Sequence, residues 1–277
     1  MTVRAIMRAA LYGVVLLGLV ACSSGTEEVP LDRLPPEEIY ARAEALMQAG
    51  KEEEAARLYG EVERLYPYSR YAEKALIRNA EALYKAKKYE EARAAAERFI
   101  AFYPASADAP WAQYLIALTW YDQIARVGRD RGAMLDALEA LREVINRYPD
   151  SDYARSARLK LDFVLDNLAA KEMEVGRYYL KRGFYPAAIN RFRVVVEDYP
   201  TSTQTPEALY RLVEAYLSLG LEDEARTAAA ILAHNYRATD WYADAYRLLE
   251  KRGLEPAPKA GGWLRTVWRR VIRGEWL

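Results

Sequence analysis

The pattern of hydrophobic and polar positions divides this chain near residue 37. Before that point lies a single apolar run, from Ala9 to Val20. From Glu37 onward, apolar and small residues recur at a regular spacing between polar ones. Glycine is sparse in this later part and runs of β-branched residues are short. The pattern therefore predicts a helical protein with almost no strand.

The helical part repeats itself, and its clearest mark is a tyrosine followed by proline. The marks begin at Tyr66, Tyr103, Tyr148 and Tyr199, with Tyr236 as a degenerate fifth. Twelve residues before the second position of each mark stands an alanine, which would let two helices approach closely. Four residues after it stands a residue that would fill the adjacent space. The alanines are Ala55, Ala92, Ala137, Ala188 and Ala225, and the second set is Tyr59, Ala96, Leu141, Phe192 and Ala229.

A period near 34 residues is that of the tetratricopeptide repeat, a helix–turn–helix unit. Gly50, Gly183 and Gly220 fall where a left-handed residue would end each first helix. The closing proline would end each second helix. We therefore expect an all-α fold, a superhelical solenoid of five tetratricopeptide-like helix pairs with a short capping helix. The pairs span residues 37–67, 69–104, 108–149, 151–200 and 205–237, and the cap spans 240–252.

Two irregularities interrupt the repeats. Residues 125–132 are an insertion, predicted to be a loop within the third pair. Residues 151–182 contain no proline and one glycine, so they can run as one long helix. This helix would link two sub-arrays, with repeats 1–2 in residues 37–104 and repeats 3–5 with the cap in residues 105–252.

The N-terminus has the parts of a secretory signal peptide over residues 1–21. Arg4 and Arg8 precede the apolar run, and Cys22, the only cysteine, follows it. Leu-Val-Ala-Cys at 19–22 resembles a bacterial lipobox, which implies N-acyl and S-diacylglycerol lipid on Cys22; an incidental buried cysteine is the alternative. Ser23 resembles an outer-membrane address. Residues 22–36 would be a lipidated N-terminus and flexible tether, of which residues 23–36 reach at most roughly 46 Å.

Composition and charge exclude several classes of function. The full chain has no net charge, and removal of Arg4 and Arg8 would leave 38 basic against 40 acidic residues. A nucleic-acid binder would show a strong basic excess. No catalytic constellation, phosphate-binding loop or metal cluster is recognisable, and His234 alone is better explained as a surface or cap residue. We expect no enzyme activity, no metal and no cofactor apart from the lipid.

Tyrosine is unusually frequent, with 22 residues. Many occupy repeat positions and belong to the core, while others fall on first helices, which line the concave face of such solenoids. Tyrosine offers rigid area and one hydrogen bond, which suits peptide recognition. Either an exposed peptide groove or additional core would explain these residues. The candidates for the groove are Tyr71, Tyr84, Tyr114 and Tyr121.

The C-terminal segment, residues 253–277, reads as a linker and a basic amphipathic helix. Its apolar residues fall at helical spacing from Trp263 to Ile272, and four arginines take the other face. Such a helix could lie on an anionic membrane, dock in a partner's groove or fold back on the solenoid. Pro256, Pro258 and the glycine pair at 261–262 separate it from the repeats, which favours an independent role.

The lipobox, the five repeats and four further stretches are similar to the BamD family, the lipoprotein subunits of the outer-membrane β-barrel assembly machinery. These stretches are residues 83–92, 161–172, 175–183 and 196–200. The resemblance implies a scaffold at the periplasmic face of the outer membrane that takes part in inserting β-barrel proteins. The basic, tryptophan-rich tail departs from the family pattern.

The resemblance also implies partners. The later repeats would hold the last periplasmic domain of a BamA-like barrel subunit, and the first two repeats would meet unfolded outer-membrane protein substrates. Other lipoproteins of the machinery would be further partners. Tyr178, Tyr179, Lys181 and Arg182 are the candidate partner-binding residues. The alternative is another repeat-bearing periplasmic lipoprotein, such as a secretin pilotin or a cell-wall coordinator.

Overall fold

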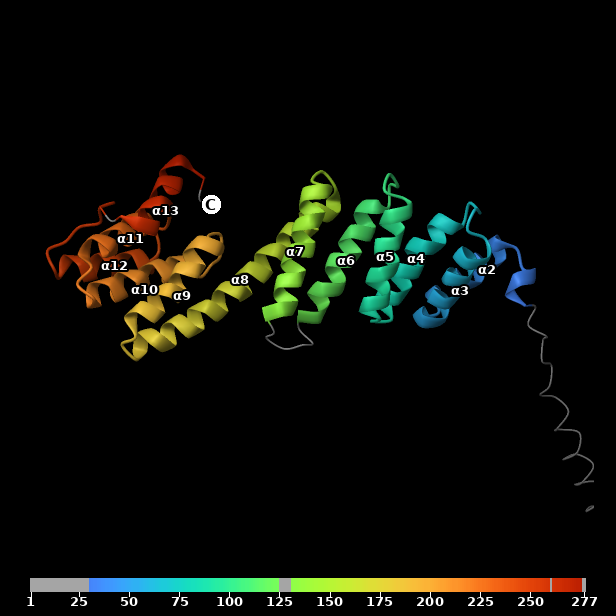
Figure 1. Ribbon diagram of the computed structural model, residues 1–277, viewed down its shortest axis with the longest axis horizontal. Helices are drawn as coiled ribbons and strands as arrows, with labels where there is room; N and C mark the ends of the chain where they lie inside the picture. The colour runs from blue at the N-terminus through green and yellow to red at the C-terminus, as the bar shows by residue number, and fades with distance from the viewer. Residues whose placement is uncertain (1–29, 125–130, 260, 276–277) are drawn as a thin grey trace, which may run out of the picture. The chain divides into compact units, whose positions relative to one another are not determined.

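The computed structural model describes residues 30–124, 131–259 and 261–275 (Figure 1). These residues form helices and no strand. The chain divides into two compact units, one ending at Ala82 and one beginning at Leu83, and each is described by itself. The elements are η1 (Leu31–Arg33), α2 (Pro36–Gln48), α3 (Glu52–Leu65), α4 (Ala72–Lys85), α5 (Tyr89–Phe102), α6 (Ala109–Ile124), α7 (Arg131–Arg147), α8 (Asp152–Lys181), α9 (Tyr185–Asp198), α10 (Thr205–Ser218), α11 (Glu222–Asn235), α12 (Asp240–Glu250) and α13 (Gly262–Arg273).

The five predicted helix pairs are confirmed, and the repeat positions explain how each pair closes. All five alanines of the repeat have no exposed surface, and neither do the five residues four positions further on. A small side chain at one position lets two helices approach, and the residue one turn later fills the space beside it. The largest of these fillers are Tyr59 in α3 and Phe192 in α9, both fully buried.

In four of the five helix pairs the turn between the helices uses a left-handed residue, as the glycines predict; the turn of the third pair lies outside the described residues. Gly50, Gly183 and Gly220 have φ angles of +68°, +76° and +72°. The second pair uses Lys87 instead, with φ of +61°. At each turn the next N–H bonds back five residues into the first helix; Lys88 N, for example, donates to Leu83 O at 2.9 Å. This bond satisfies a carbonyl that the helix end leaves unpaired.

Ser151 and Thr205 stand near the starts of α8 and α10 and make different hydrogen bonds there. The Ser151 hydroxyl accepts a hydrogen bond from Ala154 N at 3.1 Å and caps α8. Thr205 lies inside α10, and its hydroxyl donates to Tyr199 O at 3.0 Å. The buried threonine thus holds the loop before α10 to the end of α9.

The folded body begins earlier than the sequence predicts. The tether was expected to extend to Pro36, but Leu31–Arg33 form a 3-10 helix and Leu34 is only 6% exposed. The Tyr66 hydroxyl at the end of α3 donates to Leu34 O at 2.6 Å. The polar, proline-bearing composition of this segment predicts a tether, but one buried leucine joins the segment to the first unit.

Helix α8 runs unbroken for 30 residues, as predicted, which corresponds to about 45 Å. The first half of α8 packs on α6. There the ring centroids of Tyr114 and Tyr153 lie 5.6 Å apart, and those of Tyr121 and Phe163 lie 6.0 Å apart. The second half of α8 meets α9 and α10. One helix therefore connects the third repeat to the fifth within the second unit.

The insertion in the third pair is shorter than predicted. Arg131 and Gly132 were expected in a loop, but they form the first turn of α7. The remaining residues of the predicted loop, 125–130, lie outside the described part of the chain. Arg131 is held by Glu172 of α8, whose Oε1 accepts from its Nη1 at 2.7 Å, so an ion pair between helices extends α7 at its N-terminus.

The C-terminal helix α13 packs on α11 (Figure 1). The expectation that this segment stands apart from the repeats is wrong: Leu264, Val267 and Val271 are 1–5% exposed and belong to the core of the second unit. The prolines lie in the linker between α12 and α13 and the glycines at the start of α13, yet the helix still packs on the second unit. The amphipathic pattern predicted a buried face, and it could not tell which surface would bury it. Among the described residues, no helix is long and apolar enough to span a membrane.

Candidate functional site

The four candidate partner-binding residues lie together at the end of α8 and in the turn to α9. Tyr178 is 52% exposed, and its ring centroid lies 5.6 Å from that of Tyr179. The Arg182 guanidinium lies over the Tyr178 ring, 4.4 Å from its centroid. Lys181, the last residue of α8, is exposed beside them. The structure therefore gathers two tyrosines and two cations on one surface.

Phe184 completes this cluster, although no sequence pattern singled it out. Its ring is 56% exposed and its centroid lies 6.4 Å from that of Tyr179. The Phe184 N–H donates to Tyr179 O at 3.0 Å across the left-handed Gly183. The turn thus fixes the backbone beneath the aromatic rings. We call Tyr178, Tyr179, Lys181, Arg182 and Phe184 the α8–α9 cluster.

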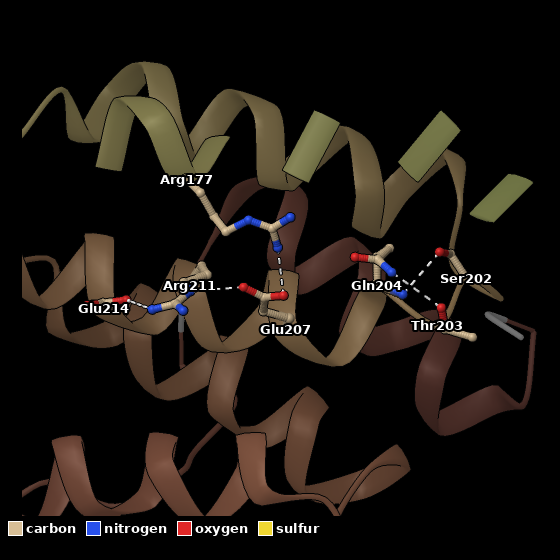
Figure 2. A network of polar contacts seen from close by, with 7 residues as sticks. All are labelled: Arg177, Ser202, Thr203, Gln204, Glu207, Arg211 and Glu214. Carbon is tan, nitrogen blue, oxygen red and sulfur yellow. Dashed lines mark hydrogen bonds and ion pairs between the residues drawn. The ribbon is translucent and has the colours of Figure 1, made fainter. Parts of the chain in front are cut away.

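A row of ion pairs continues from α8 across α10 (Figure 2). Arg177 Nη1 donates to Glu207 Oε2 at 2.7 Å, and Glu207 Oε1 accepts from Arg211 Nε at 3.2 Å. Arg211 Nη1 donates to Glu214 Oε2 at 2.8 Å. The same guanidinium lies 5.7 Å from the ring centroid of Trp241 on α12. These contacts hold α8 and α10, the first helices of the last two repeats, together. Each part-buried charge has a hydrogen-bonded partner of opposite sign.

The loop before α10 is held to α8 by a separate set of contacts. The Thr203 N–H and hydroxyl donate to the two carboxylate oxygens of Asp166, at 2.7 and 3.0 Å. Next along the loop, Gln204 N donates to Ser202 Oγ at 3.1 Å, as Figure 2 shows. Hydrogen bonds therefore fix the loop before α10 to the body of α8.

The second unit also holds three of the four groove tyrosines, in different environments. Tyr114 is 8% exposed and packs between Trp111 and Tyr153, so it contributes to the core. The Tyr84 hydroxyl donates to the Asp122 carboxylate, and burial together with this hydrogen bond raises the pKa of Tyr84. Tyr121, part-buried, has Lys160 Nζ 4.7 Å from its ring centroid.

Tyr71, the fourth groove tyrosine, lies in the first unit beside Tyr40, with ring centroids 5.5 Å apart. Below these rings, Arg78 of α4 donates two hydrogen bonds to Glu44 of α2, at 2.8 and 2.7 Å. The Tyr59 hydroxyl donates to the same carboxylate at 2.6 Å. The Arg78 hydrogen bonds, together with that of Tyr59, lower the pKa of Glu44 to about 2 despite partial burial.

These polar rows were not predicted, although the sequence carries a signal for them. Glu44 and Arg78 are 34 residues apart, one repeat period. Tyr84 pairs with Asp122 and Arg177 with Glu207, 38 and 30 residues apart. Opposite polar partners one period apart occupy equivalent places on successive first helices, so they meet whenever the helices stack.

The first unit also contains an open groove of about 770 Å³ between η1, α2 and α3. The apolar part of its lining includes Leu31, Leu46 and Leu58, and the charged part consists of Arg42, Arg57 and Glu54. Arg42 also pairs with Glu38 at 2.8 Å. Such a lining offers apolar contact area beside charges of both signs, which fits an extended peptide.

Cys22 and the lipobox lie outside the described residues, so the lipid attachment stays a prediction. In the part of the chain that is described, no group of His, Cys, Asp and Glu residues could hold a metal ion. His234 is exposed near the end of α11, edge-on to Trp268 with ring centroids 5.9 Å apart. These contacts give it a packing role at the helix end.

Comparisons with known proteins match the sequence of this chain to a family of outer-membrane lipoproteins. Residues 32–231 match the profile of the YfiO family, described as outer membrane lipoprotein. The outer membrane protein assembly factor BamD of Caulobacter vibrioides is 41% identical over 264 residues, covering 94% of this chain and 87% of the relative. The protein of the same name from Rickettsia prowazekii is 36% identical and covers 87% and 96%.

Among solved structures, a thermophilic tetratricopeptide-repeat protein of Thermus thermophilus is 20% identical, covers 76% of this chain and 98% of that chain, and has a TM-score of 0.36. The family assignment depends on the sequence matches, which extend over most of the helical repeats and most of both relatives. The chain therefore belongs to the YfiO family of outer-membrane lipoproteins.

Proposed function

We propose that this chain is a scaffold subunit of the machinery that assembles proteins into the outer membrane. It acts by binding other proteins and catalyses no reaction. The two relatives described above are both named outer membrane protein assembly factors, which favours this role over that of a secretin pilotin or a cell-wall coordinator. The match covers most of this chain and most of each relative, so the role is proposed for the whole protein.

The α8–α9 cluster carries the proposal, because it has the composition of a protein-binding hot spot. Exposed aromatic rings and arginine supply most of the binding energy in typical protein interfaces. Tyr178, near the end of α8, and Phe184, in the turn that follows, are more than half exposed, and the backbone of that turn is hydrogen-bonded. A rigid surface loses little conformational entropy on binding. The partner in this proposal is the last periplasmic domain of a BamA-like barrel subunit.

Unfolded substrates would bind elsewhere. In the first unit, the groove between η1, α2 and α3 supplies apolar contacts beside Arg42 and Arg57. Tyr71 lies on another surface of that unit, next to Tyr40. In the second unit, Tyr84 and Tyr121 flank Asp122 and leave part of their rings accessible. We propose that these surfaces bind segments of outer-membrane proteins that have not yet folded.

The anchor in this proposal is lipid on Cys22, the only cysteine of the chain. Two or three acyl chains hold a protein at a membrane far more firmly than a single chain does. We expect Cys22→Ala to abolish incorporation of a labelled fatty acid. Incorporation that persists in this variant would contradict the assignment of the anchor.

Removal of two aromatic side chains from the α8–α9 cluster tests the proposed partner surface. We expect Tyr178→Ala with Phe184→Ala to weaken co-purification of the barrel subunit about tenfold or more, because removal of aromatic anchors costs about 2 kcal/mol or more. Phe102→Ala is the matched control, because Phe102 is an aromatic residue of the same unit and is 64% exposed. Equal recovery of the partner by both variants, with unchanged thermal melting, would contradict the proposed surface.

A further inference from the structure

Helix α13 lies beyond the part of the chain that the family profile matches, which ends at residue 231. It is nevertheless an integral part of the second unit. Leu264, Val267 and Val271 are buried against the core, and Trp263 Nε1 donates to the Tyr216 hydroxyl at 3.3 Å. One face of the helix is thus fully occupied by packing.

The segment that leads to α13 is also fixed. Ala257 N donates to Arg226 O at 3.2 Å, and Lys259 N donates to Thr227 Oγ1 at 3.1 Å. Arg226 Nε in turn donates to Glu255 O at 2.9 Å. Both the linker and the helix are therefore held on α11, and the opposite face of α13 has a defined orientation on the second unit.

That opposite face is strongly basic. Arg265, Arg269 and Arg273 are exposed at intervals of four residues, which places them in one stripe about 6 Å apart. Arg270 stands beside the stripe, and between Gly262 and Arg273 the helix has no acidic residue. Within the described residues, the carboxylate that reaches these arginines is that of Glu275, 4.0 Å from Arg273.

This arrangement differs from that of several other helices. In those helices an exposed arginine pairs with a carboxylate three or four residues away, as Arg42 does with Glu38, Arg193 with Glu197 and Arg247 with Asp244. Like charges at that spacing repel one another and destabilise a helix. The stripe on α13 is therefore unfavourable in the isolated protein, and an anionic surface would remove the repulsion.

We propose that the arginine stripe of α13 binds the phosphate headgroups of anionic phospholipids. Basic residues close to an anionic membrane surface are attracted to it, and arginine forks bind phosphate oxygens in pairs. The helix lies on the headgroups without inserting, because its apolar face is already buried in the protein.

An acidic protein is a less suitable occupant, because stable protein interfaces are centred on buried apolar or aromatic anchors. On this face Ile272, 56% exposed, is the large apolar residue available. A lipoprotein of the outer membrane has a lipid surface within reach, and a basic patch adds a second attachment to a lipid anchor. The inference goes beyond the assembly role and does not depend on it.

The test uses the full lipidated protein reconstituted into vesicles, with a dye on Thr266→Cys, an exposed position of α13. Intact mass verifies that a single dye is attached, since lipid occupies Cys22. The vesicles contain phosphatidylethanolamine with or without phosphatidylglycerol, and a headgroup spin label quenches a dye that approaches the bilayer. We expect strong quenching that requires phosphatidylglycerol and decreases as salt is added.

Replacement of Arg265, Arg269 and Arg273 by glutamine should weaken this contact about a hundredfold, because each basic residue contributes about fivefold to attraction by an anionic membrane. The quenching should then equal that in vesicles without phosphatidylglycerol. The matched control replaces Arg155, Lys251 and Arg252, which are exposed on the same unit, by glutamine and should retain quenching. Thermal melting verifies that both variants fold.

Two outcomes would overturn the proposal. One is that the quenching is the same with and without phosphatidylglycerol, or that the triple variant quenches as strongly as the wild type. The other is protection of the dye that appears only when the purified partner subunits are added. In that case the stripe binds an acidic protein.

Discussion

At the residue scale, Gly176 of α8 is the position where a side chain is least tolerated. A Cβ atom there would lie 2.4 Å from the Phe192 ring of α9. Phe192 is the filler residue of its repeat and has no exposed surface. The close approach of α8 and α9 therefore depends on a glycine in the last two turns of α8, where any other residue would carry a Cβ atom.

We expect Gly176→Ala to lower the free energy of unfolding. Alanine favours a helix by about 1 kcal/mol over glycine, but overpacking of a filled core costs about 1–3 kcal/mol. The net effect should be destabilising by about 1 kcal/mol, and chemical denaturation measures it. Combination with Phe192→Leu makes room for the methyl group, so the double variant should be more stable than the sum of the two single changes indicates. Strict additivity would contradict the proposed clash.

Glu44 gives the first unit a defined dependence on pH. Hydrogen bonds from Arg78 hold its folded pKa at about 2, below its ordinary value of 4.5. A carboxylate whose pKa is lowered in the folded protein stabilises the fold when the pH is above its pKa in the unfolded chain. This contribution is lost as the pH falls through the pKa of the folded state. We expect stability of the first unit to fall between pH 4.5 and about 2.

Glu44→Gln should reduce this loss of stability at low pH. At neutral pH it should lower the free energy of unfolding by about 1.5–3 kcal/mol, as expected for the loss of hydrogen bonds to a charged group. Thermal melting across this pH range measures both effects. Glu38→Gln is the control, because the Glu38 and Arg42 side chains are 46% and 42% exposed and such pairs contribute little. A pH profile that is identical for wild type and Glu44→Gln would contradict the assignment.

At the element scale, the helices could be predicted from sequence because each repeat carries its own signals. The alanine and filler positions, the turn glycines and the closing prolines are local, and together they place all five helix pairs. Lys87 shows that the backbone requires the left-handed turn even where the sequence lacks a glycine. The long helix α8 was predictable because no proline interrupts it.

The binding surfaces were less predictable, because the burial of a side chain depends on neighbours that are distant in sequence. Tyr114 and Tyr178 are both on first helices, yet they are 8% and 52% exposed. Trp111 and Tyr153 cover the former ring. The packing of α13 on α11 was equally hard to predict, because an amphipathic pattern indicates that one face is buried but not which surface covers it.

We expect Leu159→Pro in α8 to destabilise the second unit by about 3 kcal/mol, because proline removes a helical hydrogen bond and clashes with the preceding turn. Leu159 is 71% exposed, so loss of its side chain alone should change stability little. Leu159→Ala is therefore the matched control, and chemical denaturation compares the two. Equal stability of both variants would show that the continuity of α8 is not needed.

At the scale of the whole molecule, each surface serves a separate contact. The α8–α9 cluster is proposed to hold a partner subunit, and the groove and tyrosines of the two units to receive unfolded substrates. Lipid on Cys22 and the arginine stripe of α13 would attach the chain to the membrane. In this proposal the contribution of the protein is to position other molecules.

The central claim, a role in outer-membrane protein assembly, is tested most directly by depletion of the chain in its own cells. The measurement is the amount of folded β-barrel protein in the outer membrane, quantified by mass spectrometry against periplasmic proteins that do not need assembly. The account predicts that barrel proteins decrease as the chain is depleted and recover when it is expressed again. Unchanged amounts of folded barrel proteins after depletion would contradict it.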